Sequence, residues 1–317
     1  MHFFTDWEGP WIINDIAYEL CISLFNNPEF FERLSQYDDY LYWVEKKPGY
    51  QAGDTLKLLA PFFVAADLKK EEIIEISKQT ARFVKDASEA MDFLQKRYKP
   101  VVISTSYLPY LEITTKILDV DGDVYGTEFD PEKYNIDDKW KKWLLKKVDE
   151  IASLNDIEIE NPDKKSVSYL NNLFWKELQK TPFKKVLDDA KVIGSEKKRE
   201  IVKSYGEGIV ITIGDSISDI GMFDYARKKG GLALSFNGNK FALEHANVAL
   251  ISESALSEAL VVDVFINYGM SGLKKIDEID HPLSDVDFEL YFEVNDNVIK
   301  KSLKMRKKIR GKAGELG

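Results

Sequence analysis

The sequence has little cysteine and no excess of positive charge. Cys21 is the single cysteine among 317 residues, so the chain forms no intrachain disulfide, which fits a reducing compartment. Because a lone cysteine in a chain with three histidines is a poor nucleophile, we interpret Cys21 as a small buried apolar residue. The formal net charge of −10 argues against nucleic acid as the main partner, since phosphate backbones need a positive face.

Long apolar runs and several common enzyme motifs are also missing. No uninterrupted stretch reaches membrane-spanning length, and the opening residues MHFFTDWEGPWII do not resemble a signal peptide. We therefore expect a cytoplasmic protein with no membrane partner. A serine hydrolase is disfavoured because GxSxG is absent and His2, His245 and His281 lack a convincing nucleophile partner. A Rossmann dehydrogenase is disfavoured because no GxGxxG follows the first predicted strand.

Short β-type runs alternate with helical segments, which predicts an α/β fold with a Rossmann-like parallel sheet. Strands are expected over 2–5, 100–103, 208–213, 231–236 and 248–251. The pattern is mostly helical over 13–98, with an amphipathic helix over 67–85, and is helical again over 109–118, 137–154, 166–187 and 197–205, whereas 120–135 is turn-like. The long helical stretches are longer than the ordinary crossover connections between parallel strands, so we interpret them as insertions. The predicted division is a core of 1–13, 99–135 and 186–265, a helical cap of 14–98, a helical insertion of 136–185 and a C-terminal extension of 266–317.

Carboxylates follow two of the predicted strands. Ligands of open α/β sheets bind at the carboxyl ends of strands, where residues distant in sequence converge. Asp6 and Glu8 come directly after the first strand, and Gly9-Pro10 lets the chain turn so that one carboxylate can attack phosphorus and the other can carry a proton. Taken alone, the pair is more often two solvated loop acids.

A second pair, Asp215 and Asp219, lies in a turn between a strand and a helix. Two carboxylates at this spacing suit a hard cation, which prefers oxygen ligands. The alternative is that Asp215 or Ser216 caps the helix. The strand–loop–helix context favours the metal site.

A hydroxyl and a lysine complete the set. Ser104 follows the short apolar strand from Val101 to Ile103, and its hydroxyl can hydrogen-bond a phosphoryl oxygen. Lys197 or Lys198, at the start of a helix, can neutralise charge on a transferring group. Each has a plainer interpretation, a helix cap for Ser104 and solvated surface residues for the lysines.

Together these segments resemble the ordered motifs of the haloacid dehalogenase (HAD) superfamily. The segments are FTDWEG, VVIST, SEKKREIV and ITIGDSISDIGMF. The downstream ALSFNGNKFALEHANVAL is similar to the phosphoserine-phosphatase branch, and the run from Lys198 to Val202 is similar to that branch's Lys-x-Glu-Ile-Leu, which favours Lys198 over Lys197. The resemblance covers the predicted core. The whole chain is also similar to archaeal HAD-type phosphatases, some of which carry the name of energy-converting hydrogenase A subunit R.

The resemblance implies a HAD fold and a Mg²⁺-dependent phosphatase. It makes Asp6 the nucleophile and Glu8 the acid and base, and it makes Ser104 and Lys198 the phosphoryl-binding residues. The implied Mg²⁺ ligands are the Asp6 carboxylate, the Glu8 backbone carbonyl, Asp215 and, directly or one step behind, Asp219. Glu8 replaces the usual Asp, Pro10 stands where Thr or Ser is usual, and Thr105 and Ser106 stand where the phosphoserine branch has glycines. Phosphoserine is therefore not predicted as the substrate.

The expected function is hydrolysis of a small phosphorylated metabolite through an aspartyl-phosphate. The alternatives are a phosphotransferase to an alcohol acceptor and a HAD-fold subunit or regulatory protein of a larger complex, so a protein partner stays open. In the cap, Tyr50 and Asp54 are candidate substrate contacts, although aromatic side chains there more often pack internally. The basic run over 300–312 can dock an acidic partner or membrane surface, but a solvated helix end and frayed tail is the favoured interpretation.

Overall fold

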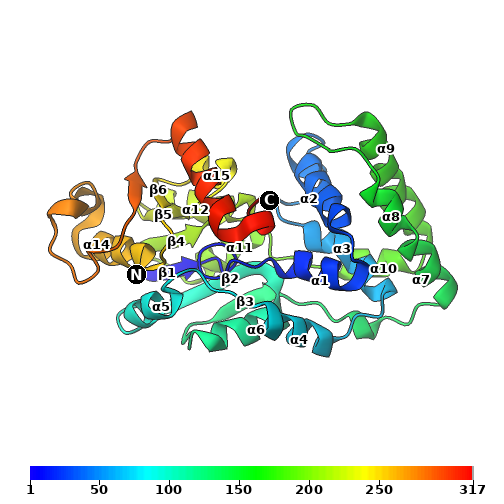
Figure 1. Ribbon diagram of the computed structural model, residues 1–317, viewed down its shortest axis with the longest axis horizontal. Coiled ribbons are helices and arrows are strands. Elements are labelled where there is room, and N and C mark those ends of the chain that lie inside the picture. The colour runs from blue at the N-terminus through cyan, green and yellow to red at the C-terminus, as the bar shows by residue number, and fades with distance from the viewer. Residues whose placement is uncertain (316–317) are drawn as a thin grey trace.

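A seven-stranded sheet forms one half of the molecule (Figure 1). The structure, a computed structural model, describes residues 1–315. The strands are β1 (His2–Thr5), β2 (Pro100–Tyr107), β3 (Val124–Thr127), β4 (Val210–Gly214), β5 (Leu232–Phe236), β6 (Val248–Ile251) and β7 (Glu289–Tyr291). Their order is β3-β2-β1-β4-β5-β6-β7, and every neighbouring pair is parallel except the β6–β7 pair. The predicted α/β class is confirmed.

Both faces of this sheet are buried, as parallel sheets require. Side chains alternate along a strand, so Phe4 and Ile103 face one layer, whereas Phe3 and Val102 face the other. The helices are α1 (Ile16–Phe25), α2 (Pro28–Trp43), α3 (Thr55–Ala65), α4 (Lys70–Thr80), α5 (Ala87–Gln95), α6 (Leu108–Ile117), α7 (Asp138–Leu145), α8 (Lys147–Ala152), α9 (Lys164–Asn172), α10 (Phe183–Asp189), α11 (Ser195–Ser204), α12 (Ile220–Lys228), α13 (Lys240–His245), α14 (Leu256–Leu273) and α15 (Asp296–Arg310). Helices α11 and α12 cover the first layer, and α5 and α14 pack together on the second.

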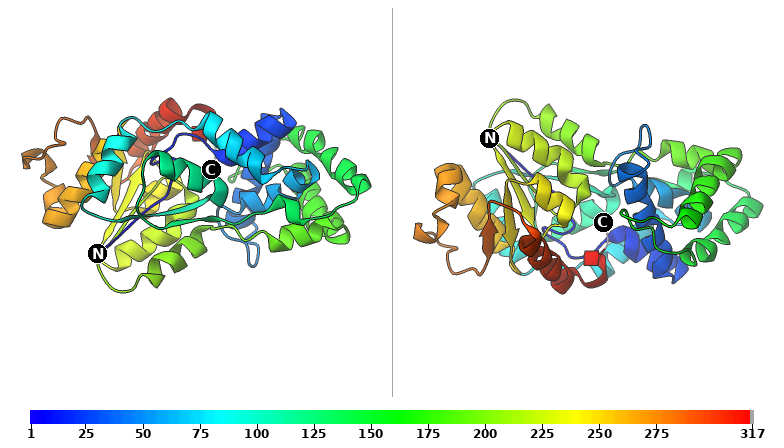
Figure 2. Two further views of the ribbon diagram at one scale, coloured as in Figure 1. Left: turned by 90° about the horizontal axis from the view of Figure 1, so that it is seen from below. Right: turned by 90° about the horizontal axis from the view of Figure 1, so that it is seen from above.

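Helices α1 to α3 and α7 to α10 form a second body beside the sheet, the inserted helical cap (Figures 1 and 2), whereas α6, α13 and α15 contact the strands. Helix α2 contacts α1, α3 and α8, and α3 contacts α7 and α10. The segments predicted as the cap, 14–98, and as a separate insertion, 136–185, thus meet in one helical body, although α5 lies beside the sheet. No helix within residues 1–315 has both the length and the apolar character needed to cross a membrane.

Two local predictions were wrong, and one predicted helix is shorter than expected. The turn-like segment 120–135 contains the four-residue strand β3, three residues of which pair with β2, because hydrogen bonds from a neighbouring strand outweigh the flanking turn residues. The amphipathic helix predicted over 67–85 starts at Lys70 and ends at Thr80. The basic C-terminal run is no frayed tail, because α15 packs against the core with Ser302 and Arg306 buried.

Candidate active site

Three aspartates meet at the carboxyl end of the sheet. Asp6 follows β1 and Asp215 follows β4, its neighbour, and the backbone N–H of Asp6 continues the ladder to the carbonyl of Ile213 at 2.8 Å. Asp219 lies in the turn that leads to α12. Each aspartate is buried, and each offers one carboxylate oxygen within 4.8 Å of the others. The adjacency of β1 and β4 therefore brings together residues that lie more than two hundred positions apart.

Lys198 joins two of these carboxylates. Its Nζ lies 2.8 Å from Oδ2 of Asp6 and 2.7 Å from Oδ1 of Asp219, and its side chain has no solvent exposure. Burial acts to lower the pKa of Lys198, but Asp219 and Asp6 outweigh it and raise that pKa, so the ammonium stays charged. Lys197 points to solvent and pairs with Glu200 at 3.0 Å. Of the two lysines, Lys198 is therefore the one that lies in the aspartate cluster.

Asp219 is held by the turn in which it lies. Its Oδ2 accepts the backbone N–H groups of Asp215 at 2.9 Å and Ser216 at 3.0 Å. Burial raises the pKa of Asp219 from 3.8 to about 7, Lys198 acts to lower it, and Asp6 and Asp215 raise it further. A carboxylate so strongly desolvated needs its cationic partner to stay ionised.

The chain after β1 is fixed by buried side chains. The backbone N–H of Trp7 donates to Oδ1 of Asp6 at 2.7 Å, which orients the carboxylate. Trp11 Nε1 donates to the hydroxyl of Thr5 at 2.7 Å, and that hydroxyl donates to the carbonyl of Asp6 at 2.7 Å. Asp6 is therefore preorganised by its own loop.

Gly9 brings this loop against the turn of Asp215. Its φ is +102°, and a Cβ atom added to it would lie 2.0 Å from Oδ2 of Asp215. Backbone with this φ strongly favours glycine, and this approach leaves no room for a side chain.

We expect Gly9→Ala to displace Asp215 and to cost about 1–3 kcal/mol of stability, with loss of any activity of the site. Urea denaturation measures the stability. Gly206→Ala is the matched control, because Gly206 has φ +87° with nothing within 4 Å of its added Cβ. Equal effects of the two changes would mean that φ alone, and not the contact with Asp215, matters at Gly9.

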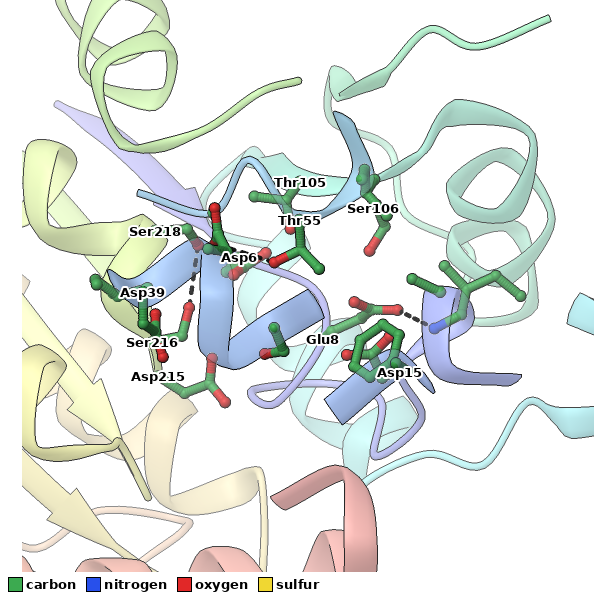
Figure 3. A pocket seen from close by; sticks show the side chains of 18 of the residues that line it. Asp6, Glu8, Asp15, Asp39, Thr55, Thr105, Ser106, Asp215, Ser216 and Ser218 are labelled. Carbon is green, nitrogen blue, oxygen red and sulfur yellow. Dashed lines mark hydrogen bonds between the residues drawn. The ribbon is translucent and has the colours of Figure 1, made fainter. Parts of the chain in front are cut away.

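Glu8 lies in the same cavity but faces the cap (Figure 3). Its Oε1 accepts the backbone N–H of Ile16 at 2.8 Å, at the start of α1, which Asp15 caps. Burial, followed by the charge of Asp15, raises the pKa of Glu8 from 4.5 to about 8. A carboxyl group that keeps its proton at neutral pH can act as a general acid.

Ser104 lies within β2, because this strand continues to Tyr107 beyond its predicted end. Ser104 is fully buried and its hydroxyl lies 3.3 Å from that of Ser106. Thr105 and Ser106, and not Ser104, line the cavity (Figure 3). The structure thus places Ser104 one step behind the cavity wall, and Ser106 is a hydroxyl that the sequence-based prediction missed.

The cavity measures about 100 Å³ and lies between core and cap. Asp38, Asp39 and Thr55 line it from the cap side. A Cβ atom added to Gly53 would lie 3.0 Å from the Cβ of Ser218, so the cap rests directly on the Asp215–Asp219 turn. Tyr50 and Asp54, the candidate substrate contacts, lie behind this wall: Tyr50 donates to Asp38 at 2.6 Å, and Asp54 is buried.

Two arginines of α15 complete the wall. Arg306 and Arg310 both bind Oδ2 of Asp215, Arg310 at 2.9 Å, and both line the cavity. Sequence reasoning missed them because they sit in a run of lysines. A signal was present: Ser302, Arg306 and Arg310 recur at a spacing of four, which puts them on one face of a helix.

The donor set fits a hard divalent cation. Asp6, Asp215 and Asp219 supply carboxylate oxygens, the ligand type that Mg²⁺ prefers, in a buried cluster. Carboxylates gathered this closely repel one another, and a cation offsets that repulsion. Three of the four residues predicted as metal ligands are thus brought together, and their role as ligands, like that of the Glu8 carbonyl, stays a prediction.

Taken together, the fold and the site define an α/β protein with a buried aspartate–lysine cluster at the carboxyl end of a parallel sheet, roofed by a helical cap. The structure of gene product AF1437 from Archaeoglobus fulgidus is 40% identical to this chain, with a TM-score of 0.91, and the match covers 100% of this chain and 98% of that one. The chain belongs to the same protein family as this archaeal gene product.

Two structures of phosphoserine phosphatases match at lower similarity. A phosphoserine phosphatase with a phospho-aspartyl intermediate analogue is 16% identical, with a TM-score of 0.46, over 78% of this chain and 91% of that one. A substrate-bound phosphoserine phosphatase is also 16% identical, with a TM-score of 0.42, over 78% of this chain and 90% of that one. A scan against protein-family profiles and a search of curated proteins gave no match.

Proposed function

We propose that the protein is a HAD-type phosphatase that hydrolyses a small phosphomonoester through an aspartyl-phosphate at Asp6. The contact of Lys198 with both Asp6 and Asp219 carries this proposal, because it sets a nucleophilic carboxylate beside a fixed cation. Phosphoryl transfer needs chiefly positioning and charge neutralisation, which this cluster supplies. The small cavity suits a small leaving group. The cytoplasmic location and the hydrogenase-subunit name stay predictions.

In the first step, a carboxylate oxygen of Asp6 bonds to phosphorus and the bond from phosphorus to the leaving oxygen breaks. Glu8 gives its proton to that oxygen, so the substrate leaves as an alcohol. Lys198 binds phosphoryl oxygens, and the hydroxyl of Ser106, which lines the cavity, is placed to assist. When bound by Asp6, Asp215 and Asp219, Mg²⁺ would supply charge neutralisation on the transferring group.

In the second step, water replaces the alcohol. Glu8, now ionised, takes a proton from water, the water oxygen bonds to phosphorus, and the bond to Asp6 breaks to release phosphate. The cap excludes bulk water while the acyl phosphate exists. Glu8 thereby recovers its proton, and Asp6 its carboxylate.

The direct test is hydrolysis of p-nitrophenyl phosphate by the purified protein, with Mg²⁺ and with EDTA. We expect turnover with Mg²⁺ and none with EDTA. If folded protein fails to release phosphate from this compound and from a broad panel of phosphorylated metabolites, the proposal is wrong.

Glu8→Gln tests the proton transfer. We expect turnover of an alkyl phosphate to fall by about 10²–10⁴-fold, because the leaving alkoxide then receives no proton. Formation of the aspartyl-phosphate from p-nitrophenyl phosphate should fall far less, because nitrophenolate leaves without a proton. Stopped-flow release of nitrophenolate and single-turnover release of the alcohol measure the two rates. Equal losses for both substrates would argue against Glu8 as the acid.

A further inference from the structure

Helix α15 brings two fixed positive charges to a residue that the proposed function needs as a metal ligand. The side chains of Arg306 and Arg310 are 3% and 7% exposed, and both contact one oxygen of Asp215. Arg306 also donates to the carbonyl of Asp215 at 3.1 Å. The carboxylate of Asp215 is therefore ion-paired before any metal arrives.

Both guanidinium groups are anchored from several sides. Arg306 Nε donates to the carbonyl of Gly314 at 3.0 Å. Arg310 donates to the carbonyls of Ile13 at 3.2 Å and Asn14 at 3.3 Å, in the segment that connects the site to α1. Ser302, one turn before Arg306, donates to the carbonyl of Gly238 at 2.7 Å. Moving either arginine away from Asp215 breaks these bonds, so the pair stays in place.

The carboxylates that would hold a metal are consequently paired with basic side chains. Asp6 and Asp219 contact the ammonium of Lys198, and Asp215 contacts the two guanidinium groups. A divalent cation that binds Asp215 alone is placed beside both guanidinium groups in a buried site, where charge repulsion is strong. A phosphate group entering with the cation offsets this repulsion.

We propose that Arg306 and Arg310 are positioning residues that make the site bind its divalent cation and its phosphorylated substrate cooperatively. The inference rests on the proposed function and adds a coupling of affinities to it: the metal is held weakly alone and tightly with phosphate. Because such coupling is reciprocal, phosphate also binds more tightly when Mg²⁺ is present. The C-terminal extension is thus part of the site.

Isothermal titration of Mg²⁺ into the full chain, with and without inorganic phosphate, tests the inference. For wild type we expect phosphate to tighten Mg²⁺ binding by about tenfold or more, within the usual range of such couplings. Arg310→Met should bind Mg²⁺ alone about tenfold more tightly and lose most of the coupling, because one positive charge near the metal is gone. Arg310→Lys, which keeps the charge, should retain the wild-type coupling.

Lys304→Met is the matched control, since it removes one positive charge from the exposed side of the same helix and should leave both affinities unchanged. Arg306→Met is the second variant and should act as Arg310→Met does, with circular dichroism to verify folding of each protein. If folded Arg310→Met keeps the wild-type affinities and coupling, the inference is wrong and the phosphatase proposal stands. If neither wild type nor any variant binds Mg²⁺ with or without phosphate, the metal-dependent function itself fails.

Discussion

Asp6→Asn is expected to abolish phosphate release, with a loss of about four orders of magnitude or more in turnover. The amide has the shape of the carboxylate and can still accept the N–H of Trp7, so the fold should persist. It lacks the nucleophilic oxygen, so no bond to phosphorus forms. Steady-state hydrolysis of p-nitrophenyl phosphate with Mg²⁺ measures the loss.

Asp92→Asn is the matched control for this change. Asp92 lies on the exposed side of α5 and pairs with Lys96 at the surface, so its replacement should leave turnover unchanged. If the Asp6→Asn protein folds as the wild type does and keeps a tenth of the wild-type turnover, Asp6 is excluded as the nucleophile.

Lys198→Met should affect both stability and catalysis. Removing the ammonium leaves the carboxylates of Asp6 and Asp219 buried without their shared cation, and breaking a buried ion pair from one side costs about 3–5 kcal/mol. Turnover should fall by about 10²–10³-fold, because a fixed charge on the transferring group is lost. Urea denaturation in EDTA and steady-state kinetics measure the two effects.

The loss of stability in Lys198→Met should depend on pH. Asp219 has a folded pKa raised from 3.8 to about 7, and Lys198 is the group that acts to lower it. Without Lys198 the folded state holds the proton of Asp219 to still higher pH, whereas the unfolded chain releases it near pH 4. The free energy of unfolding of the variant therefore falls as the pH rises from the unfolded pKa of Asp219 to its folded pKa. The variant should be more strongly destabilised at pH 8 than at pH 5.

Lys197→Met provides the control for Lys198→Met. Lys197 is exposed and pairs only with Glu200 within the described residues, so its replacement should change stability by a few tenths of a kcal/mol. If the two variants unfold at the same urea concentration at pH 8, the buried ion pair does not hold the cluster together.

The convergence of Asp6 and Asp215 could be predicted from the sequence because both follow apolar strands. All strands of a parallel sheet bring their carboxyl ends to one edge, so the positions of the two aspartates after strands predicted that they can converge. That the two strands are neighbours came from the structure. The choice of Lys198 over Lys197 rested on a resemblance, and burial is what separates the two lysines in the structure.

The contribution of α15 could not be predicted in the same way. Its basic residues are typical of a solvated helix end, and although Ser302, Arg306 and Arg310 share one face of the helix, nothing local shows that this face is buried. Its burial depends on the docking of α15 against the Asp215 turn, a contact across 91 positions. Long-range packing of this kind overrides local composition.

The predicted end of the strand before Ser104 was wrong for a related reason. Ser104, Thr105 and Ser106 are polar, and polar residues after an apolar run predict a loop. Pairing with β3 extends β2 to Tyr107 instead, with an irregularity in the register between Ile103 and Tyr107, and Thr105 and Ser106 both line the cavity. The missed strand β3 and the misplaced hydroxyl are thus one error.

The most direct test of the account is to trap the covalent intermediate. Wild type is mixed with a phosphomonoester and Mg²⁺, quenched in acid within milliseconds, and reduced with borohydride, which converts an aspartyl-phosphate to homoserine. Tandem mass spectrometry then locates the altered residue. We predict homoserine at position 6, and none in Asp6→Asn. Turnover with no modified residue, or with the modification at another aspartate, would contradict the central claim.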